Sequence, residues 1–73
     1  MTPQERFDYK TKWMQTSSNP IKIHSDLEFA AKQWCKTNLE QHQWHFSKYT
    51  DVYEDTFYFE SADHARKFDN EIA

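Results

Sequence analysis

Glycine is absent from all 73 residues of this chain, and no other feature limits its possible folds so strongly. Phosphate-binding loops and dinucleotide-binding turns need glycine, because the backbone must approach the phosphate closely. The glycine-flanked turn that exposes a nucleophilic serine in many hydrolases needs it too. The sequence therefore excludes these kinds of site, and its turns must use asparagine, aspartate, serine or longer loops.

A chain of this length has room for one domain with a small core, so bulky side chains must supply much of its stability. Six Phe, four Tyr and three Trp provide them, and each ring can bury roughly 150–250 Å². The single cysteine, Cys35, has no disulfide partner in the chain, which fits a reducing compartment. No apolar run approaches the ~18 residues of a membrane span, and no signal peptide is recognisable. We expect one cytoplasmic domain, residues 1–73, with an N-terminal helix and linker (1–19) and a β-α-β-β-α core (20–73).

Two pairs of residues mark helix starts. Thr2 and Glu5 have the spacing at which each side chain bonds the other's backbone N–H, so a helix is expected over residues 3–15. Ser25 and Glu28 repeat this spacing and predict a second helix behind them. The run expected to end the first helix is Ser17-Ser18-Asn19-Pro20.

The second helix and a third helix that opens at residues 61–63 have apolar stripes at three- and four-residue steps, the spacing of one helix face. The stripe of the second helix consists of Leu27, Ala30, Ala31, Trp34, Cys35 and Leu39. The stripe of the third helix consists of Ala65, Phe68 and Ile72.

Three segments alternate apolar and polar residues, as strands with one buried face do. They are residues 20–24, 43–49 and 56–60. The last two lie in the densest aromatic stretch, Trp44 to Glu60, in which seven of seventeen residues are Trp, Phe or Tyr. Because a two-residue primed turn is unfavourable without glycine, we expect residues 50–55 to form a longer loop built on a type I turn.

The expected element order is therefore α-β-α-β-β-α. A β-α-β step most simply gives two parallel strands, and the hairpin makes the third strand antiparallel to the second. If the third strand inserts between the other two, the strand order is 1-3-2. The predicted fold is α+β, with a three-stranded antiparallel-type sheet of split βαβ topology. It is a truncated ferredoxin-like fold that lacks the fourth strand.

Alternation divides this sheet into two faces. The side chains expected to face the helices are those of Ile21, Ile23, Trp44, Phe46, Phe57 and Phe59. The opposite, open face carries Lys22, His24, His45, Ser47, Tyr49, Thr56, Tyr58 and Glu60. This open face is either solvated and partly covered by the N-terminal helix, or it is a binding platform.

A protein is the expected ligand of such a platform, because tyrosine is a favoured interface anchor. Residues 50–73 carry seven acidic and two basic side chains, a net charge of −5. Their acidic rim would steer the chain toward a basic partner surface. The candidate partner-binding residues are His45, Tyr49, Asp51, Tyr53, Glu54, Asp55 and Tyr58.

Two other kinds of binding stay open. Single-stranded nucleic acid stacks on aromatic sheet faces, although the net charge of −3 opposes contact with phosphates. Homodimer formation would bury aromatic rings that a small core leaves uncovered.

No residue pattern predicts a metal, cofactor or catalytic site. His42 and His45 are three residues apart, so on a strand they point to opposite faces. Cys35 lies in an apolar stripe, where a thiol behaves as a small hydrophobic group. The acidic residues 51–55 lack the alternating oxygen ligands and the glycine of a calcium loop. We therefore expect no enzyme, no cofactor and no metal.

Two stretches resemble small proteins of T4-like tailed phages that infect cyanobacteria. They are the opening, Met1 to Lys10, and the strand-then-helix ending from Thr56 to Phe68, in which an aromatic strand runs into a helix with an acidic residue, an alanine and a later Phe. His64 separates Asp63 from Ala65, a departure from that pattern. The resemblance implies a non-catalytic accessory protein of the host cytoplasm that binds a host or viral protein and inhibits or redirects it.

Overall fold

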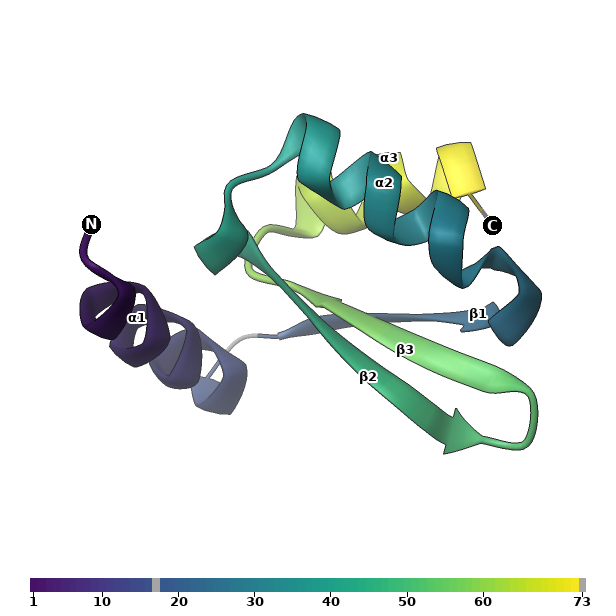
Figure 1. Cartoon of the computed structure of the whole chain (residues 1–73), viewed down its shortest axis with the longest axis horizontal. Helices are drawn as coiled ribbons and strands as arrows, with labels where there is room; N and C mark the ends of the chain where they lie inside the picture. Colours follow the sequence, from purple (N-terminus) through teal and green to yellow (C-terminus); the bar gives the residue numbers. More distant parts are fainter. Residues whose placement is uncertain (17, 73) are drawn as a thin grey trace.

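The computed structural model describes residues 1–16 and 18–72, and within them Figure 1 shows α-helices packed on a small sheet. The predicted order α-β-α-β-β-α is confirmed, with two added 3₁₀ turns. The elements are α1 (Pro3–Thr16), β1 (Asn19–His24), the 3₁₀ helix η1 (Ser25–Leu27), α2 (Glu28–Asn38), the 3₁₀ helix η2 (Gln41–Gln43), β2 (Trp44–Asp51), β3 (Glu54–Phe59) and α3 (Ala62–Ile72). Ser17, one of the residues expected to end the first helix, lies outside the described residues. Within the described ranges, no helix has the length and apolar character needed to cross a membrane.

β3 is the central strand of the sheet. It pairs antiparallel with both β1 and β2, so the two outer strands run parallel to each other. The predicted order 1-3-2 and the split βαβ arrangement are therefore confirmed. Phe57 lies opposite Ile21 on one neighbour and opposite Phe46 on the other. This register places apolar side chains of all three strands on one face.

α2 and α3 lie together over that face, and the core fills the space between them and the sheet (Figure 1). Phe57, Phe59 and Phe68 are fully buried. The ring centroid of Phe68 lies 5.0 Å from that of Phe57 and 4.9 Å from that of Phe59. The prediction that both strand phenylalanines face the helices is confirmed. Full burial of each such ring stabilises the fold by about 1.5–3 kcal/mol.

The helix starts follow the predictions only in part. The Thr2 hydroxyl accepts the N–H of Glu5, and the Glu5 carboxylate accepts the N–H of Thr2, both at 3.2 Å, so the first capping box is confirmed. The prediction of a second capping box, formed by Ser25 and Glu28, is wrong. η1 begins one turn before α2, and His24 Nδ1 accepts the N–H of Asp26 at 3.1 Å. The Ser25 hydroxyl is thereby left to bond elsewhere.

The hairpin between β2 and β3 is tighter than expected. Asp51 pairs with Glu54, so Val52 and Tyr53 alone form the connection, and the prediction of a six-residue loop is wrong. Tyr53 has a φ of 57°, and Tyr49, where the β2–β3 register shifts, has a φ of 56°. Two tyrosines therefore adopt the left-handed backbone that glycine adopts most easily.

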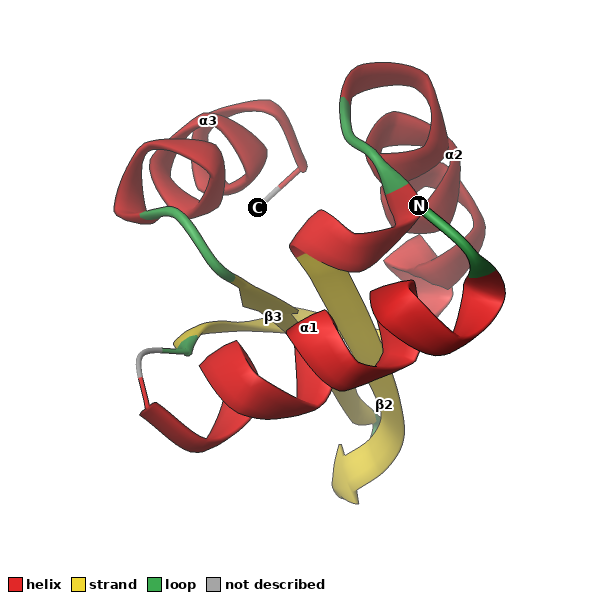
Figure 2. Cartoon of the chain, turned by 90° about the vertical axis from the view of Figure 1, so that its left-hand side faces the viewer, coloured by secondary structure: helices red, strands yellow, loops and turns green. Residues whose placement is uncertain are grey.

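α1 lies at the end of the sheet where β2 begins, apart from the layer formed by α2 and α3 (Figures 1 and 2). It packs mainly against η2. The buried Trp13 donates its indole N–H to the His42 carbonyl at 2.8 Å, and the Tyr9 hydroxyl donates to the Glu60 carboxylate. α1 also borders His45 at one end of the face that was expected to be open, and Thr56 on the same face is buried.

Candidate protein-interaction surface

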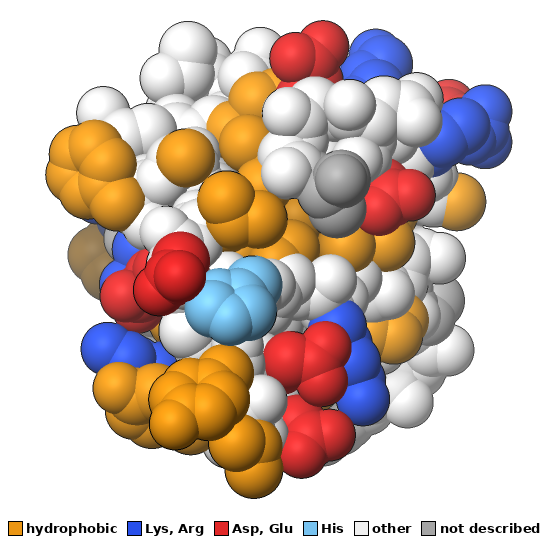
Figure 3. Space-filling model, turned by 90° about the vertical axis from the view of Figure 1, so that its right-hand side faces the viewer, with side chains coloured by type: hydrophobic (Ala, Val, Ile, Leu, Met, Phe, Trp, Pro, Cys, Tyr) orange, Lys and Arg blue, Asp and Glu red, His pale blue; other side chains and the backbone are white. Residues whose placement is uncertain are grey.

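Exposed apolar side chains gather at the β2–β3 turn, at the end of the molecule opposite α1 (Figure 1). Tyr49 is 69% exposed, Val52 75% and Tyr53 71%. The acidic residues Asp51 and Glu54 flank the turn. We call these five residues the hairpin tip. Figure 3 shows hydrophobic side chains beside acidic ones on the face at this end of the molecule, and such exposed apolar groups rimmed by polar ones mark interaction sites.

Hydrogen bonds from neighbouring segments fix the backbone of the hairpin tip. The N–H of Tyr49 donates to the Asp55 carboxylate at 2.9 Å, and the N–H of Ser25 donates to the Tyr53 carbonyl at 2.8 Å. The ring of Tyr53 is stacked on that of His24, with centroids 6.4 Å apart and planes 13° apart. A left-handed backbone costs a non-glycine residue about 1–2 kcal/mol. These contacts offset that cost and hold both tyrosines in one outward arrangement.

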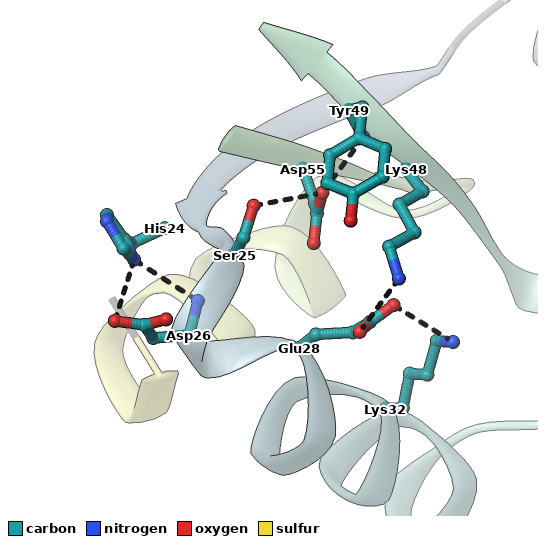
Figure 4. A network of polar contacts seen from close by, with 8 residues as sticks. All are labelled: His24, Ser25, Asp26, Glu28, Lys32, Lys48, Tyr49 and Asp55. Atoms are coloured by element: carbon teal, nitrogen blue, oxygen red, sulfur yellow. Dashed lines mark hydrogen bonds and ion pairs between the residues drawn. The ribbon is translucent and has the colours of Figure 1, made fainter. Parts of the chain in front are cut away.

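Asp55 lies beneath the hairpin tip and is fully buried. Its Oδ1 also accepts the Ser25 hydroxyl at 3.4 Å (Figure 4), and its Oδ2 has no hydrogen-bond partner among the described residues. The prediction that Asp55 belongs to an exposed acidic rim is therefore wrong. β3 begins at Glu54, two residues earlier than expected, and strand alternation puts Asp55 on the same face as Phe57.

The cations beside the hairpin tip are paired with one carboxylate of α2. Glu28 lies 3.3 Å from the Lys32 ammonium and 3.6 Å from the Lys48 ammonium (Figure 4). Glu28 is the main cause that raises the pKa of Lys48, followed by Tyr49, whose ring centroid lies 5.0 Å from Nζ. Glu28 offsets one of these two positive charges, and the carboxylates of Asp51 and Glu54 outweigh the other, so these five side chains together carry a net charge of −1.

The seven sequence-predicted binding residues fall into two separate groups. The structure brings together Tyr49, Asp51, Tyr53 and Glu54 at the tip, above Asp55. His45 and Tyr58 face each other across β2 and β3, with ring centroids 6.2 Å apart. They lie toward α1, where burial and then the nearby Lys10 ammonium lower the pKa of His45. Binding by any of these residues stays a prediction.

Sequence reasoning missed Val52 and His24 as parts of this surface. Val52 is an apolar residue at a turn between two acidic side chains, a signal that was available in the sequence. The sequence predicts His24 on the open face of the sheet. Its stacking on Tyr53 depends on the short turn between β2 and β3, and no local sequence pattern predicts that turn. Phe29, 80% exposed on α2, is a further isolated apolar side chain of the described surface.

The described residues offer little of the chemistry of an active site. Burial raises the pKa of the Cys35 thiol to about 12, and the side chain is inaccessible. A reactive cysteine needs the opposite, a lowered pKa and access to solvent. Residues 1–16 and 18–72 contain no group of three His, Cys, Asp or Glu side chains placed to hold a metal ion.

Comparison with known proteins adds no further constraint: no family model, no curated protein and no solved structure matches the chain.

Proposed function

We propose that the chain is a non-catalytic module that binds another protein through the hairpin tip. The observation that carries this proposal is the exposure of Tyr49, Val52 and Tyr53 at one hairpin end, on a backbone held by hydrogen bonds. Aromatic anchors at the centre of an interface supply most of its binding energy. A backbone that is already fixed loses little conformational entropy on binding, so less of the binding energy is lost to ordering the loop.

Charge indicates the kind of partner. Asp51 and Glu54 flank the apolar side chains, and the neighbouring lysines are paired with Glu28. A basic rim on the partner would meet them and speed association. The resemblance to small phage proteins suggests a host or viral protein in the host cytoplasm, which the chain would inhibit or redirect.

Affinity capture with matched variants tests the proposal. Val52→Asp and Tyr49→Ala change the hairpin tip, and Phe29→Ala removes an exposed ring of α2 that is not one of the five residues of the tip. We expect the wild type and Phe29→Ala to retain one partner from a host lysate and the two tip variants to lose it. Loss of one apolar anchor weakens binding by at least about tenfold. Equal capture by all four proteins, each shown to be folded by circular dichroism, would contradict the proposal.

Single-stranded nucleic acid on the open face is the second candidate. One observation favours it, the neighbouring rings of His45 and Tyr58 close to the Lys10 ammonium. Short single strands should then shift in a gel, and the shift should weaken steeply with salt. Tyr58→Ala should abolish the shift and Tyr53→Ala should not. The absence of a shift at low salt removes this candidate.

A further inference from the structure

We propose that the chain associates with itself head to tail, the hairpin tip of one copy docking in a groove beside α1 of the next. This groove consists of two adjoining hollows of about 280 and 340 Å³ that share Phe7 and Lys10. The lining residues used in the argument are Arg6, Phe7, Lys10, Met14 and His45. We call this set the α1 groove.

The α1 groove combines apolar surface with uncompensated positive charge. Phe7 is 66% exposed, and Met14 is half-buried beside it. Arg6 and Lys10 are the charged residues of the lining, and among the described residues no carboxylate lies within 4 Å of either cationic group. Burial and the Lys10 ammonium lower the pKa of His45, which favours the neutral form of its ring. An acidic segment with apolar side chains is the complementary ligand.

The hairpin tip has this chemistry. Val52 and Tyr53 project at the turn, and the carboxylates of Asp51 and Glu54 lie on either side of them. Two acidic side chains of the tip thus face two basic side chains of the groove, with apolar surface at the centre of each. Complementary charge of this kind selects the register of docking and the partner.

The two surfaces cannot meet within one chain. α1 and the hairpin turn lie at opposite ends of the molecule (Figure 1), whose longest extent is 32 Å. Contact between them requires a second copy, and the resulting pair still has one free tip on one copy and one free groove on the other. Such a contact between unlike surfaces builds open chains or rings instead of a closed symmetric dimer. A partner bound to the tip, as proposed above, would compete with this association, although the inference does not rest on that function.

Sedimentation velocity of the purified protein over a range of concentrations tests the inference. The wild type should show a mean mass that rises continuously with concentration and falls with added salt. Lys10→Glu and Glu54→Lys should each weaken association by about tenfold or more, because a like-charge contact replaces an attraction. The variant that carries both changes should regain it, since the two charges are exchanged. Lys67→Glu and Glu71→Lys make the same charge changes on exposed positions of α3 and should have no such effect.

Three results would overturn the inference: a wild type that stays monomeric at the highest concentration, equal effects of Lys10→Glu and Lys67→Glu, or no recovery in the double variant. Circular dichroism and thermal unfolding of each variant separate lost docking from lost folding, and Phe7→Ala probes the groove without any change in charge. Because this assay contains no other protein, its outcome is independent of the capture experiment. Lys10→Glu should not reduce partner capture even where it abolishes self-association, because it leaves the hairpin tip intact.

Discussion

Asp55 shows how one buried side chain positions an exposed surface. Its Oδ1 accepts the N–H of Tyr49 at 2.9 Å and the hydroxyl of Ser25 at 3.4 Å, so it joins β3 to the irregular part of β2 and to η1. No partner contacts it directly, since it is fully buried. We regard it as a residue that positions the hairpin tip.

Asp55→Ala removes the acceptor of the part-buried Tyr49 N–H, and we expect it to lower the free energy of unfolding by about 1–3 kcal/mol. Asp55→Asn keeps one carbonyl oxygen that can accept the N–H of Tyr49, so it should lower the free energy of unfolding by less than Asp55→Ala does. Urea denaturation followed by circular dichroism measures both. An alanine variant as stable as the wild type would show that these hydrogen bonds contribute nothing.

The misplacement of Asp55 has a simple physical origin. The sequence pattern predicts a strand that begins at Thr56. In the structure the strand begins at Glu54, so the same alternation extends two residues further toward the N-terminus. Asp55 then shares the face of Phe57 and Phe59. Aspartate is rarely fully buried, so its presence at position 55 favours a loop over a strand. Asp55 is nevertheless buried in the strand, because Tyr49 and Ser25 donate hydrogen bonds to its carboxylate.

At the level of elements, helices and strands were predictable where side-chain periodicity is strong. The stripes of α2 and α3 and the alternation of β2 and β3 depend on burial against one core, and Ala31, Cys35, Ala65 and Phe68 are buried as expected. The tight hairpin was not predictable, because tyrosine has no intrinsic preference for positive φ. The backbone geometry of the hairpin tip is therefore a product of tertiary contacts, although the sequence predicts four of its five residues as candidates for binding, namely Tyr49, Asp51, Tyr53 and Glu54.

The junction between α1 and the sheet contains a titrating group, His45. Burial and the Lys10 ammonium lower its pKa below the ordinary value of 6.5. The unfolded chain therefore takes up a proton near pH 6.5, where the folded chain does not, and stability falls as the pH drops through this range. Above this pH range, the contribution of His45 to the free energy of unfolding is fully present.

We expect the free energy of unfolding of wild type to fall more steeply than that of His45→Gln as the pH is lowered from about 7.5 to about 5.5. The difference between the two stability curves isolates the contribution of position 45. Lys10→Gln should reduce the pH dependence, because it removes the second cause of the lowered pKa. Parallel stability curves for wild type and His45→Gln would show that His45 is not perturbed at this junction.

At the scale of the whole molecule, the fold separates stability from recognition. Aromatic rings on the helix-covered face of the sheet build the core, and those at the turn and beside α1 stay exposed. The topology was predictable because a β-α-β step and a hairpin leave few strand orders. The division of exposed rings between two ends of the molecule depends on where α1 docks, and local pattern does not determine that position.

The small core makes Cys35 a reporter of global unfolding. Its thiol is inaccessible, and burial raises its pKa to about 12, so a thiol reagent has almost no thiolate to attack in the folded protein. We expect labelling at mildly alkaline pH to be slow in buffer and to accelerate with urea over the range in which the circular dichroism changes. Phe57→Leu, which loosens the ring cluster beside Cys35, should cost about 1 kcal/mol and speed labelling by about fivefold.

Val52→Ser is the matched control for this experiment, because Val52 is exposed at the turn and remote from the core cluster. Its labelling rate should equal that of the wild type. Labelling that is fast in buffer, or that precedes the loss of circular dichroism, would mean that α2 opens while the sheet stays folded. In that event the helices and the sheet would not share one cooperative core, and the rings of Phe57, Phe59 and Phe68 could not couple them.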